Sequence, residues 1–265
     1  MGKIRHARVK YKSCPLCKSK QIADFLKADC TSHVLYNPVL PKTMAWKRCT
    51  KCEHVFTDGY FTLKSLDVIF SKTPDSQTVG CDIESERDIS AEIVQRIDTL
   101  RDGAQGRWLD VGFGNGSLLF TADEWGYEVI GVDLRQTSVD AINALGIEAY
   151  CVELTKFSPP EPLDVVSMAD VLEHMPFPDK ALQHVYKLLE VGGVLFISMP
   201  NMVSQLWRTM DQQNINPYWG EIEHYHNFGR GRLFSLLEDC GFQDCRYGVS
   251  KRYRACMEIT ALRRR

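Results

Sequence analysis

The strongest constraint on what this chain can fold into is a glycine-rich loop that joins an apolar run to a helical run. Residues 108–116 read WLDVGFGNG, so the apolar run passes through Asp110 and continues into three alternating glycines. Glycines at a strand-to-helix junction let the backbone approach a ligand closely and leave helix N–H groups pointing at it. The segment therefore predicts a ligand-binding turn after the first strand of an α/β domain.

Strand-like and helix-like patterns alternate along the chain after residue 82. A helix is predicted at 83–100, and a hairpin from the last two strand-like runs, 242–250 and 253–262. The remaining strand-like runs are 107–112, 127–133, 147–153, 163–169 and 194–200, mostly separated by segments of helical periodicity. This order predicts an α/β fold of five parallel strands, covered by helices on both faces and closed by a C-terminal antiparallel hairpin.

Two carboxylates near the loop indicate what kind of ligand it binds. A dinucleotide site favours G-x-G-x-x-G, but here the spacing is G-x-G-x-G and Ser117 stands at the third glycine position. Asp110 is placed to attract a cationic amino group, and Asp133, at the end of the second strand, to accept both hydroxyls of a ribose. These features suit an adenosine with an amino-acid tail and no pyrophosphate. A glycine-rich turn of another nucleotide-binding α/β protein is the alternative.

Three motifs, WLDVGFGNG, VIGVD and LDVVSMADVLEHM, resemble those of the class I S-adenosylmethionine-dependent methyltransferases over about 85–262. The resemblance implies a Rossmann-like methyltransferase sheet with S-adenosylmethionine as methyl donor. It places Gly112 and Gly114 beside the methionine part, Asp133 at the ribose and residues 152–154 at the adenine. The implied cofactor-binding set is Asp110, Gly112, Phe113, Gly114, Asn115, Gly116, Asp133, Leu134, Val152, Glu153, Leu154, Met168, Ala169 and Asp170.

Two C-x-x-C pairs precede this domain. Two C-x-x-C motifs together can place four thiolates tetrahedrally around Zn²⁺. A closed site of four protein ligands has no open position, so its expected role is structural. Cys30, His33 and His54 lie nearby in the sequence and are alternative ligands. The predicted zinc ligands are Cys14, Cys17, Cys49 and Cys52.

The segment around these cysteines, CPLC and then RCTKCEHVFTDGYFTLKSL, resembles the zinc ribbon that precedes many bacterial methyltransferases of secondary-metabolite and surface-polysaccharide pathways. Tetronitrose-type sugar C-methyltransferases are one such group, but their further C-terminal domain has no counterpart here. We predict a zinc-ribbon module over 1–60, a connector or lid over 61–82 and a methyltransferase domain over 83–265. Tyr60, Phe61 and Phe70 are expected to cover the donor.

His174 is the first candidate for acid–base chemistry. It follows the fourth predicted strand, so it should face the cofactor edge of the sheet. L-E-H at this place is widespread in the methyltransferase superfamily, including the ubiquinone-pathway O-methyltransferases. The alternative is a histidine that only caps its loop against Pro176 and Pro178.

The segment 219–228, WGEIEHYHNF, is the second candidate. It resembles the E-H element that supplies acid–base groups in sugar-methylating relatives, which implies catalytic roles for Glu223 and His224. Glu221, His224 and Asn227 are also a conceivable metal site. An ordinary loop whose histidines hydrogen-bond locally is the third interpretation.

Charge and cysteine content constrain the partners and the compartment. Residues 1–60 carry 12 Lys/Arg against 4 Asp/Glu, while the remainder carries 20 against 30. A basic head suggests an anionic acceptor, or a solvated arm. Ten cysteines, with no apolar stretch long enough for a signal sequence or a membrane span, indicate the reducing cytoplasm.

The sequence thus predicts an enzyme that moves a methyl group from S-adenosylmethionine to a small-molecule acceptor. Transfer to oxygen is preferred, on a sugar, a nucleotide-sugar or a phosphate-bearing metabolite. One alternative is a ribosomal or transfer RNA methyltransferase with an RNA-binding head, although the acidic catalytic domain and the lack of an N-P-P-[YF] element count against it. The other is a cofactor-binding scaffold without catalysis.

Overall fold

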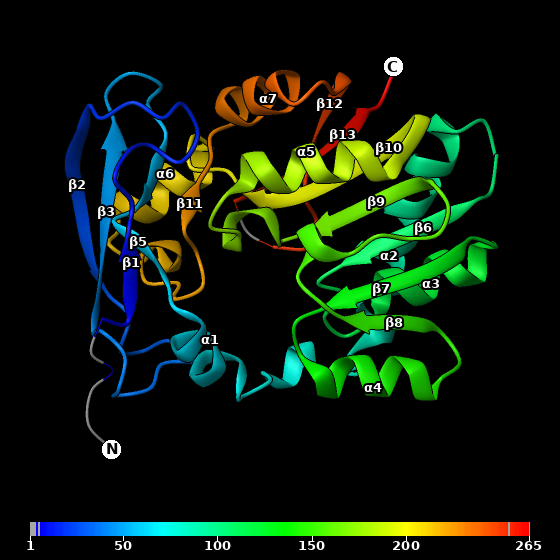
Figure 1. The fold of residues 1–265 in the computed structure, drawn as a ribbon, viewed down its shortest axis with the longest axis horizontal. Helices are drawn as coiled ribbons and strands as arrows, with labels where there is room; N and C mark the ends of the chain where they lie inside the picture. Colours follow the sequence, from blue (N-terminus) through cyan, green and yellow to red (C-terminus); the bar gives the residue numbers. More distant parts are fainter. Residues whose placement is uncertain (1–3, 5, 254, 265) are drawn as a thin grey trace.

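The computed structural model describes residues 4, 6–253 and 255–264. Its largest element is a seven-stranded sheet in the order β12-β13-β10-β9-β6-β7-β8 (Figure 1). The five strands from β8 to β10 are parallel, and β13 pairs antiparallel with both β10 and β12. The prediction of five parallel strands and a C-terminal hairpin is confirmed. The strands are β6 (Arg107–Val111), β7 (Glu128–Asp133), β8 (Glu148–Cys151), β9 (Leu163–Ala169), β10 (Leu189–Pro200), β12 (Gln243–Val249) and β13 (Cys256–Leu262).

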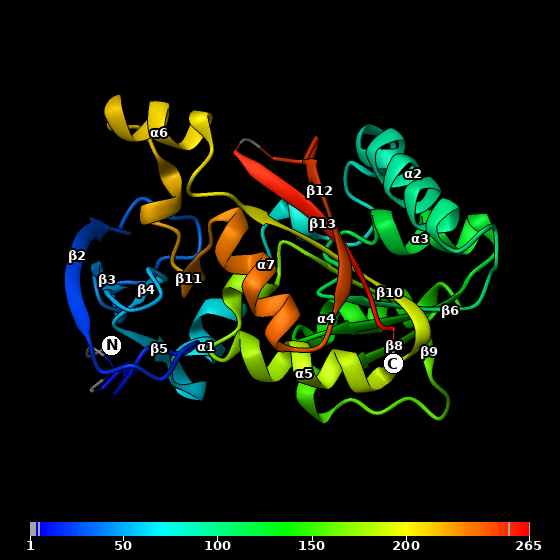
Figure 2. The same cartoon turned by 90° about the horizontal axis from the view of Figure 1, so that it is seen from above.

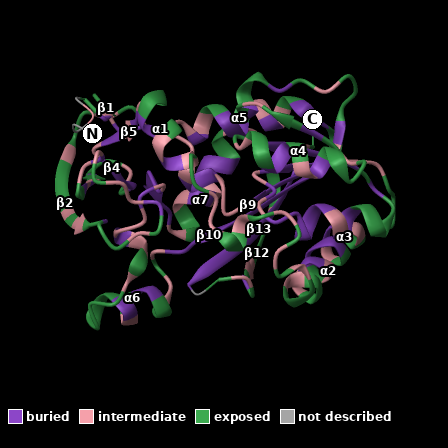
Figure 3. Ribbon diagram, turned by 90° about the horizontal axis from the view of Figure 1, so that it is seen from below, coloured by how far each residue is buried: buried purple, intermediate pink, exposed green. Residues whose placement is uncertain are grey.

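Helices cover both faces of this sheet because its central strands are apolar on both sides. The helices α2 (Ile83–Leu100), α3 (Ser117–Trp125) and α4 (Gln136–Ala144) share one apolar cluster with the sheet. The helices α5 (Pro178–Leu188) and α7 (Arg230–Asp239) share a second one. Figure 2 shows α2 and α3 on one side of the strands and α5 on the other. The central strands are accordingly buried, including all of β13 (Figure 3).

The N-terminal head contains a four-stranded antiparallel sheet in the order β11-β4-β3-β2. Three of its strands come from the predicted head, but the fourth comes from the segment 219–228. The module is therefore not built from residues 1–60 alone. The strands are β2 (Ile22–Asp29), β3 (Thr43–Cys49), β4 (Val55–Thr57) and β11 (His226–Asn227), next to a ribbon of β1 (Arg8–Lys10) and β5 (Gly59–Phe61).

The connections between these sheets are short helices. Helix α1 (Leu63–Phe70) lies between the head and the large sheet in Figure 1, and α6 (Gln205–Gln212) follows β10. Single 3₁₀ turns are η1 (Asp75–Gln77), η2 (Leu154–Lys156), η3 (Leu172–His174) and η4 (Pro217–Trp219). None of the helices in the described part of the chain combines the length and apolarity needed to cross a membrane.

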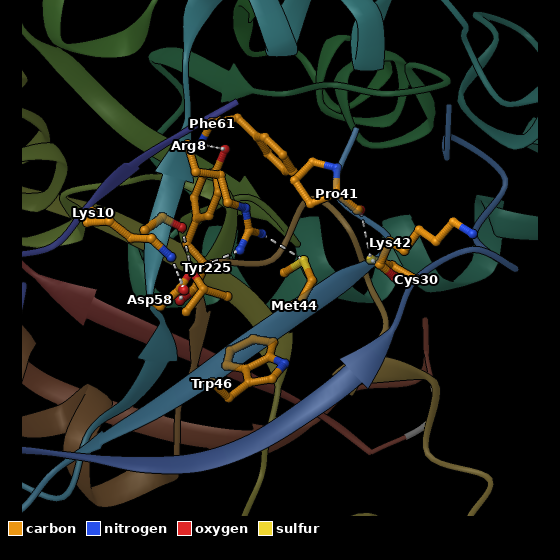
Figure 4. Close-up of polar contacts among 12 residues, drawn as sticks. Arg8, Lys10, Cys30, Pro41, Lys42, Met44, Trp46, Asp58, Phe61 and Tyr225 are labelled. Carbon is orange, nitrogen blue, oxygen red and sulfur yellow. Dashed lines mark hydrogen bonds and ion pairs between the residues drawn. The ribbon is translucent and has the colours of Figure 1, made fainter. Parts of the chain in front are cut away.

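A buried arginine, Arg8, lies where the N-terminal head packs against the segment 219–228. The Arg8 side chain is only 6% exposed and lies 3.3 Å from the Asp58 carboxylate, with its guanidinium 4.5 Å from the centre of the Phe61 ring. The backbone N–H of Phe61 donates a hydrogen bond of 3.3 Å to the Tyr225 hydroxyl (Figure 4). Because Tyr225 belongs to the segment 219–228, this contact holds the head and that segment as one packed unit.

Candidate active site

A cavity of about 770 Å³ lies at the carboxyl ends of the parallel strands β6 to β9. Loops after these strands line one side, and the connector helix α1 and strand β5 line the opposite side. In open parallel sheets, ligands bind in this crevice, where adjacent loops diverge. The topology therefore brings the glycine loop, the two predicted carboxylates and the connector to one place.

The glycine loop adopts a backbone that side chains disfavour. Gly112, Gly114 and Gly116 have φ angles of 65°, 54° and 85°. A Cβ atom at Gly112 would come within 2.8 Å of the Val171 side chain, whereas one at Gly114 would meet nothing within 4 Å. Gly114 lines the cavity, so that open space is a cradle that a ligand can fill. Gly116 instead precedes helix α3 as its N-cap and does not line the cavity.

Two carboxylates at the strand ends lie deep in the cavity wall. Asp110 is 2% exposed and accepts a hydrogen bond of 2.6 Å from the Ser167 hydroxyl. Burial raises the pKa of Asp110 to about 7, although that hydrogen bond and the charge of Arg252 act in the opposite direction. Burial also raises the pKa of Asp133, which accepts a hydrogen bond of 2.8 Å from the backbone N–H of Arg135. Neither carboxylate forms an ion pair with another described residue, and both line the cavity, where a ligand can donate hydrogen bonds to them.

Most of the predicted cofactor residues come together around this cavity. Met168 does not: it is fully buried in the apolar cluster under α5 and α7. Successive side chains of a strand point to opposite faces, so Ala169 at the end of β9 reaches the cavity and its neighbour Met168 does not. The predicted residues that line it are Asp110, Gly112, Phe113, Gly114, Asn115, Asp133, Leu134, Val152, Glu153, Leu154, Ala169 and Asp170.

The wall opposite the glycine loop is apolar and aromatic. Tyr60, Phe61 and Phe70, the residues predicted to cover the donor, all line the cavity, with Phe177 and Tyr225 beside them. The Phe70 ring also lies 4.9 Å from the Arg135 guanidinium. A ligand that enters the cavity is therefore enclosed by aromatic side chains from the head, the connector and the segment 219–228.

The three predicted catalytic residues occupy different positions. His174 and Glu223 line the cavity, and Glu223 lies 3.6 Å from Arg135. His224 is buried and does not line the cavity; its ring packs edge-on against that of His174, with centroids 4.7 Å apart. Burial, together with the neighbouring His174, lowers the pKa of His224 to about 3. His224 is thus a neutral imidazole behind His174, not a group that contacts a ligand in the cavity.

Two further polar residues of the segment 219–228, Glu221 and His226, are engaged elsewhere, whereas the buried side-chain amide of Asn227 has no hydrogen-bond partner among the described residues. Glu221 forms an ion pair with His33, and the metal site of Glu221, His224 and Asn227 stays a prediction. His226 donates from Nε2 to the Met175 carbonyl oxygen at 3.0 Å, and its Nδ1 lies 3.0 Å from Nε2 of His54. These contacts tie the head to the loop that follows His174.

The four cysteines predicted to bind zinc do converge. Their sulfur atoms all lie within 4.8 Å of one another, with 3.7 Å between Cys14 and Cys52 and 3.5 Å between Cys17 and Cys49. A tetrahedral zinc site with Zn–S bonds of about 2.3 Å requires S···S separations of about 3.8 Å, whereas a disulfide requires about 2.05 Å. The arrangement fits a four-thiolate zinc site. Of the alternatives, Cys30 donates to the Lys42 carbonyl oxygen and His54 contacts His226.

Three basic residues that line the cavity, Arg135, Lys180 and Arg252, were not predicted from the sequence. Arg135 follows β7 and pairs with Glu223, and Arg252, between β12 and β13, lies 3.4 Å from the Asp170 carboxylate. Arg252 reaches the cavity only because the C-terminal hairpin folds back beside β10, and no local motif marks that contact. Several basic residues of the head also form ion pairs within the protein, among them Lys18 with Asp179, which reduces the positive charge available to an anionic ligand.

Comparison with known proteins agrees with this geometry. A model of the methyltransferase domain family matches residues 85–246, more than half of the chain. The chain belongs to the methyltransferase domain family. The resemblance to S-adenosylmethionine-dependent methyltransferases stated from the sequence is therefore confirmed, and the cysteine cluster is compatible with the zinc-ribbon head.

Solved methyltransferases share the fold of this family member. Magnesium protoporphyrin IX methyltransferase from Synechocystis, with bound SAH, aligns with a TM-score of 0.55 at 17% identity, over 78% of this chain and 90% of that one. The N-methyltransferase NodS from Bradyrhizobium japonicum, in complex with S-adenosyl-L-homocysteine, aligns with a TM-score of 0.51 at 16% identity, over 69% and 88%. At this identity the likeness concerns the fold.

Curated relatives are named as ubiquinone biosynthesis O-methyltransferases. The protein from Idiomarina loihiensis is 32% identical over 120 residues, which are 42% of this chain and 49% of the relative. The protein from Pseudomonas entomophila is 31% identical over 132 residues, which are 45% of this chain and 57% of the relative. The chain spans about half the length of these relatives. The sugar acceptor expected from the sequence is not supported, because these names refer to ubiquinone biosynthesis.

Proposed function

We propose that this methyltransferase transfers a methyl group from S-adenosylmethionine to a hydroxyl oxygen of an apolar small molecule. The observation that carries the proposal is the single cavity that joins the glycine loop to the aromatic wall. Cavities of about 300–1,000 Å³ enclose most of a drug-sized ligand, which gives room for donor and acceptor groups together. The names of the curated relatives support oxygen as the methylated atom.

The cavity residues fit the donor at both of its polar ends. Asp110 would hold the cationic amino group, Asp133 the ribose hydroxyls, and the space beside Gly114 the methionine part. Val152, Glu153 and Leu154 line the part of the cavity beyond β8, where the adenine would lie. When bound, S-adenosylmethionine supplies a methyl group that its sulfonium already activates, so the protein has to align the acceptor, exclude water and accept a proton.

The acceptor would lie between the aromatic wall and the pair His174 and Glu223. Phe61, Phe70 and Phe177 would hold an apolar body by contact area, and Arg135 and Lys180 line the same cavity. His174 and Glu223, which also line it, would handle the hydroxyl proton. His224, packed against the His174 ring, is a positioning residue.

Labelled methyl transfer tests this proposal and its alternatives. We expect the purified protein to methylate hydroxylated apolar aromatics and to leave nucleotide-sugars and total RNA unlabelled. An RNA methyltransferase would instead label RNA and lose affinity for it steeply with salt. Binding of S-adenosylmethionine without transfer to any acceptor would favour the scaffold. The cytoplasmic location stays a prediction from the cysteine content.

Donor affinity should fall on acidification because of Asp110. Its raised pKa of about 7 means that below pH 7 this carboxyl is mostly protonated in the free protein. A bound amino group favours the carboxylate, so binding releases a proton there; affinity is complete above pH 7 and is lost as the pH falls. We expect Kd for S-adenosylmethionine to rise about fivefold to tenfold from pH 7.5 to 6.

Calorimetry at the two pH values, in buffers of different ionisation enthalpy, measures both the affinity and the released proton. Asp110→Asn should bind more weakly at pH 7.5 and lose most of the pH dependence. An undiminished pH dependence in that variant would assign the effect to another group.

A further inference from the structure

A second group of metal-ligand side chains lies directly beside the acceptor end of the cavity. Glu173 and His174 belong to the 3₁₀ turn η3, and His224 comes from the segment 219–228. One ligand atom of each lies within 4.8 Å of the other two. The three residues are separate from the cysteine site, which contains only residues of the head.

The buried atoms of this group lack partners. Glu173 is 1% exposed, and neither of its carboxylate oxygens has a hydrogen-bond partner among the described residues. Nδ1 of His224, which is 5% exposed, is also without one there. Leaving a buried carboxylate uncompensated costs several kcal/mol, so such groups are normally paired or bound to a metal.

The nearby charged side chains are already engaged with other residues. Arg252 pairs with Asp170, Arg135 with Glu223, and His33 with Glu221. No ion pair joins a Lys or Arg of the described residues to Glu173. Among the described residues, the group therefore presents a carboxylate oxygen and two imidazoles without a Lys or Arg paired to that oxygen.

We propose that Glu173, His174 and His224 bind a divalent transition-metal ion that activates the acceptor hydroxyl. Two imidazoles and one carboxylate form a donor set that suits Mn²⁺, Fe²⁺ or Zn²⁺ and leaves coordination positions open. His174 is the member of the set that lines the cavity, so an acceptor oxygen reaches the ion from that side. This inference rests on the proposed function, since the ion acts on the hydroxyl that is to be methylated.

The ion has a defined chemical part in the transfer. A divalent cation lowers the pKa of an oxygen bound to it, as it does for water, so the hydroxyl loses its proton near neutral pH. With His174 as a ligand of the ion, Glu223 is the cavity residue that takes up this proton and passes it to solvent. The resulting oxyanion attacks the methyl carbon: the new O–CH₃ bond forms while the S⁺–CH₃ bond breaks, and the sulfur keeps that electron pair. The products are the methyl ether, the neutral thioether and one proton.

Binding of Mn²⁺ alone tests the site without reference to turnover. The full-length protein, with zinc retained at its cysteines, is titrated with Mn²⁺, and the free ion is followed by electron paramagnetic resonance. We expect one equivalent to bind with a Kd on the order of 10 μM, Mn²⁺ being the weakest binder of the divalent first-row ions. Glu173→Gln, which keeps the side-chain volume, and His174→Ala, which empties a position at the cavity, should each weaken binding at least tenfold.

Two controls make the result specific. Glu258→Gln alters a carboxylate that is equally buried but lies 2.6 Å from Arg96, and it should leave Mn²⁺ affinity unchanged. Cys245→Ser, at a half-buried thiol on β12 that belongs to neither group, should also leave it unchanged. Absence of bound Mn²⁺ in the parent, or equal affinity in Glu173→Gln, overturns the inference.

Donor binding in the same preparations separates this inference from the proposed function. Protein that binds S-adenosylmethionine but no Mn²⁺ retains the methyltransferase site and loses only the metal proposal. Protein that binds Mn²⁺ but not S-adenosylmethionine loses the proposed function, and with it the role assigned to the ion.

Discussion

Replacing Gly114 by valine should reduce the affinity for S-adenosylmethionine at least hundredfold. Gly114 lines the cavity with open space where its Cβ would stand, so the valine methyl groups would occupy the volume assigned to the methionine part of the donor. A hundredfold loss corresponds to about 2.7 kcal/mol, which the lost backbone approach and the steric overlap readily exceed. Isothermal calorimetry of the parent and the variant measures the effect.

Backbone strain must be separated from blockage of the cavity. Gly146 is a matched control: its φ of 87° is also left-handed and a Cβ there meets nothing within 4 Å, but it lies on an exposed turn after α4. Both valine variants should lose roughly 1–2 kcal/mol or more of stability from that backbone geometry. Only Gly114→Val should lose its affinity for S-adenosylmethionine. Equal donor affinity in Gly114→Val and the parent would remove the glycine loop from the binding site.

Asp133→Ala should weaken the same ligand by a different route. A hydrogen bond to a charged group contributes about 1.5–3 kcal/mol, and the carboxylate is placed to accept two from a ribose. We expect at least a tenfold rise in Kd for S-adenosylmethionine, with a smaller rise for methionine, which has no ribose. Equal losses for both ligands would indicate general damage to the loop.

The second large effect should come from the cysteine site. Cys49→Ser removes one of four converging thiolates, and we expect the variant to lose its equivalent of zinc and to melt on the order of 10 °C lower than the parent. Zinc content by mass spectrometry of the native protein and thermal unfolding measure the two losses. Cys245→Ser, at a half-buried thiol on β12 outside the cluster, is the control and should change neither.

Cys49→Ser should also weaken binding of the acceptor more than binding of S-adenosylmethionine. The head reaches the loop after His174 through the Tyr11 hydroxyl, which donates to the Pro176 carbonyl oxygen at 2.8 Å, and through His226 to Met175. If the four thiolates hold zinc, its loss should disorder the head and therefore raise KM for the acceptor several-fold, while Kd for S-adenosylmethionine changes little. Two results would contradict the proposed link between the cysteine site and the acceptor site: Cys49→Ser that keeps its zinc, or Cys49→Ser that loses affinity for acceptor and S-adenosylmethionine equally.

The five parallel strands and the C-terminal hairpin of the large sheet could be predicted from the sequence because their signals are local. Most of the parallel strands contain a short apolar run, the glycines directly follow β6, and Asp110 and Asp133 stand at the ends of β6 and β7. The contacts that complete the site are long-range. Arg252, in the hairpin of β12 and β13, pairs with Asp170, which follows β9. Strand β11 pairs with β4, which lies much earlier in the chain.

The errors in the predicted site have equally specific causes. Met168 was placed at the cavity by its motif, but the alternation of side chains in β9 turns it into the core. The resemblance implies a catalytic role for His224, yet the turn that brings Glu223 to the cavity buries His224 behind His174. Glu173 was read only as part of the L-E-H motif, since nothing in a sequence reveals that a carboxylate will be buried without a partner.

The strand that completes the head has a consequence for how the protein is made. His54 and His226, which meet across the β4–β11 pair, are 172 positions apart in the chain. On the ribosome, the cysteine pairs emerge early, but the edge of β4 stays open until residues 226–227 have been synthesised. An open strand edge is a template for pairing with other chains. Translation that stalls before residue 226 should therefore yield nascent fragments that aggregate even when zinc is plentiful.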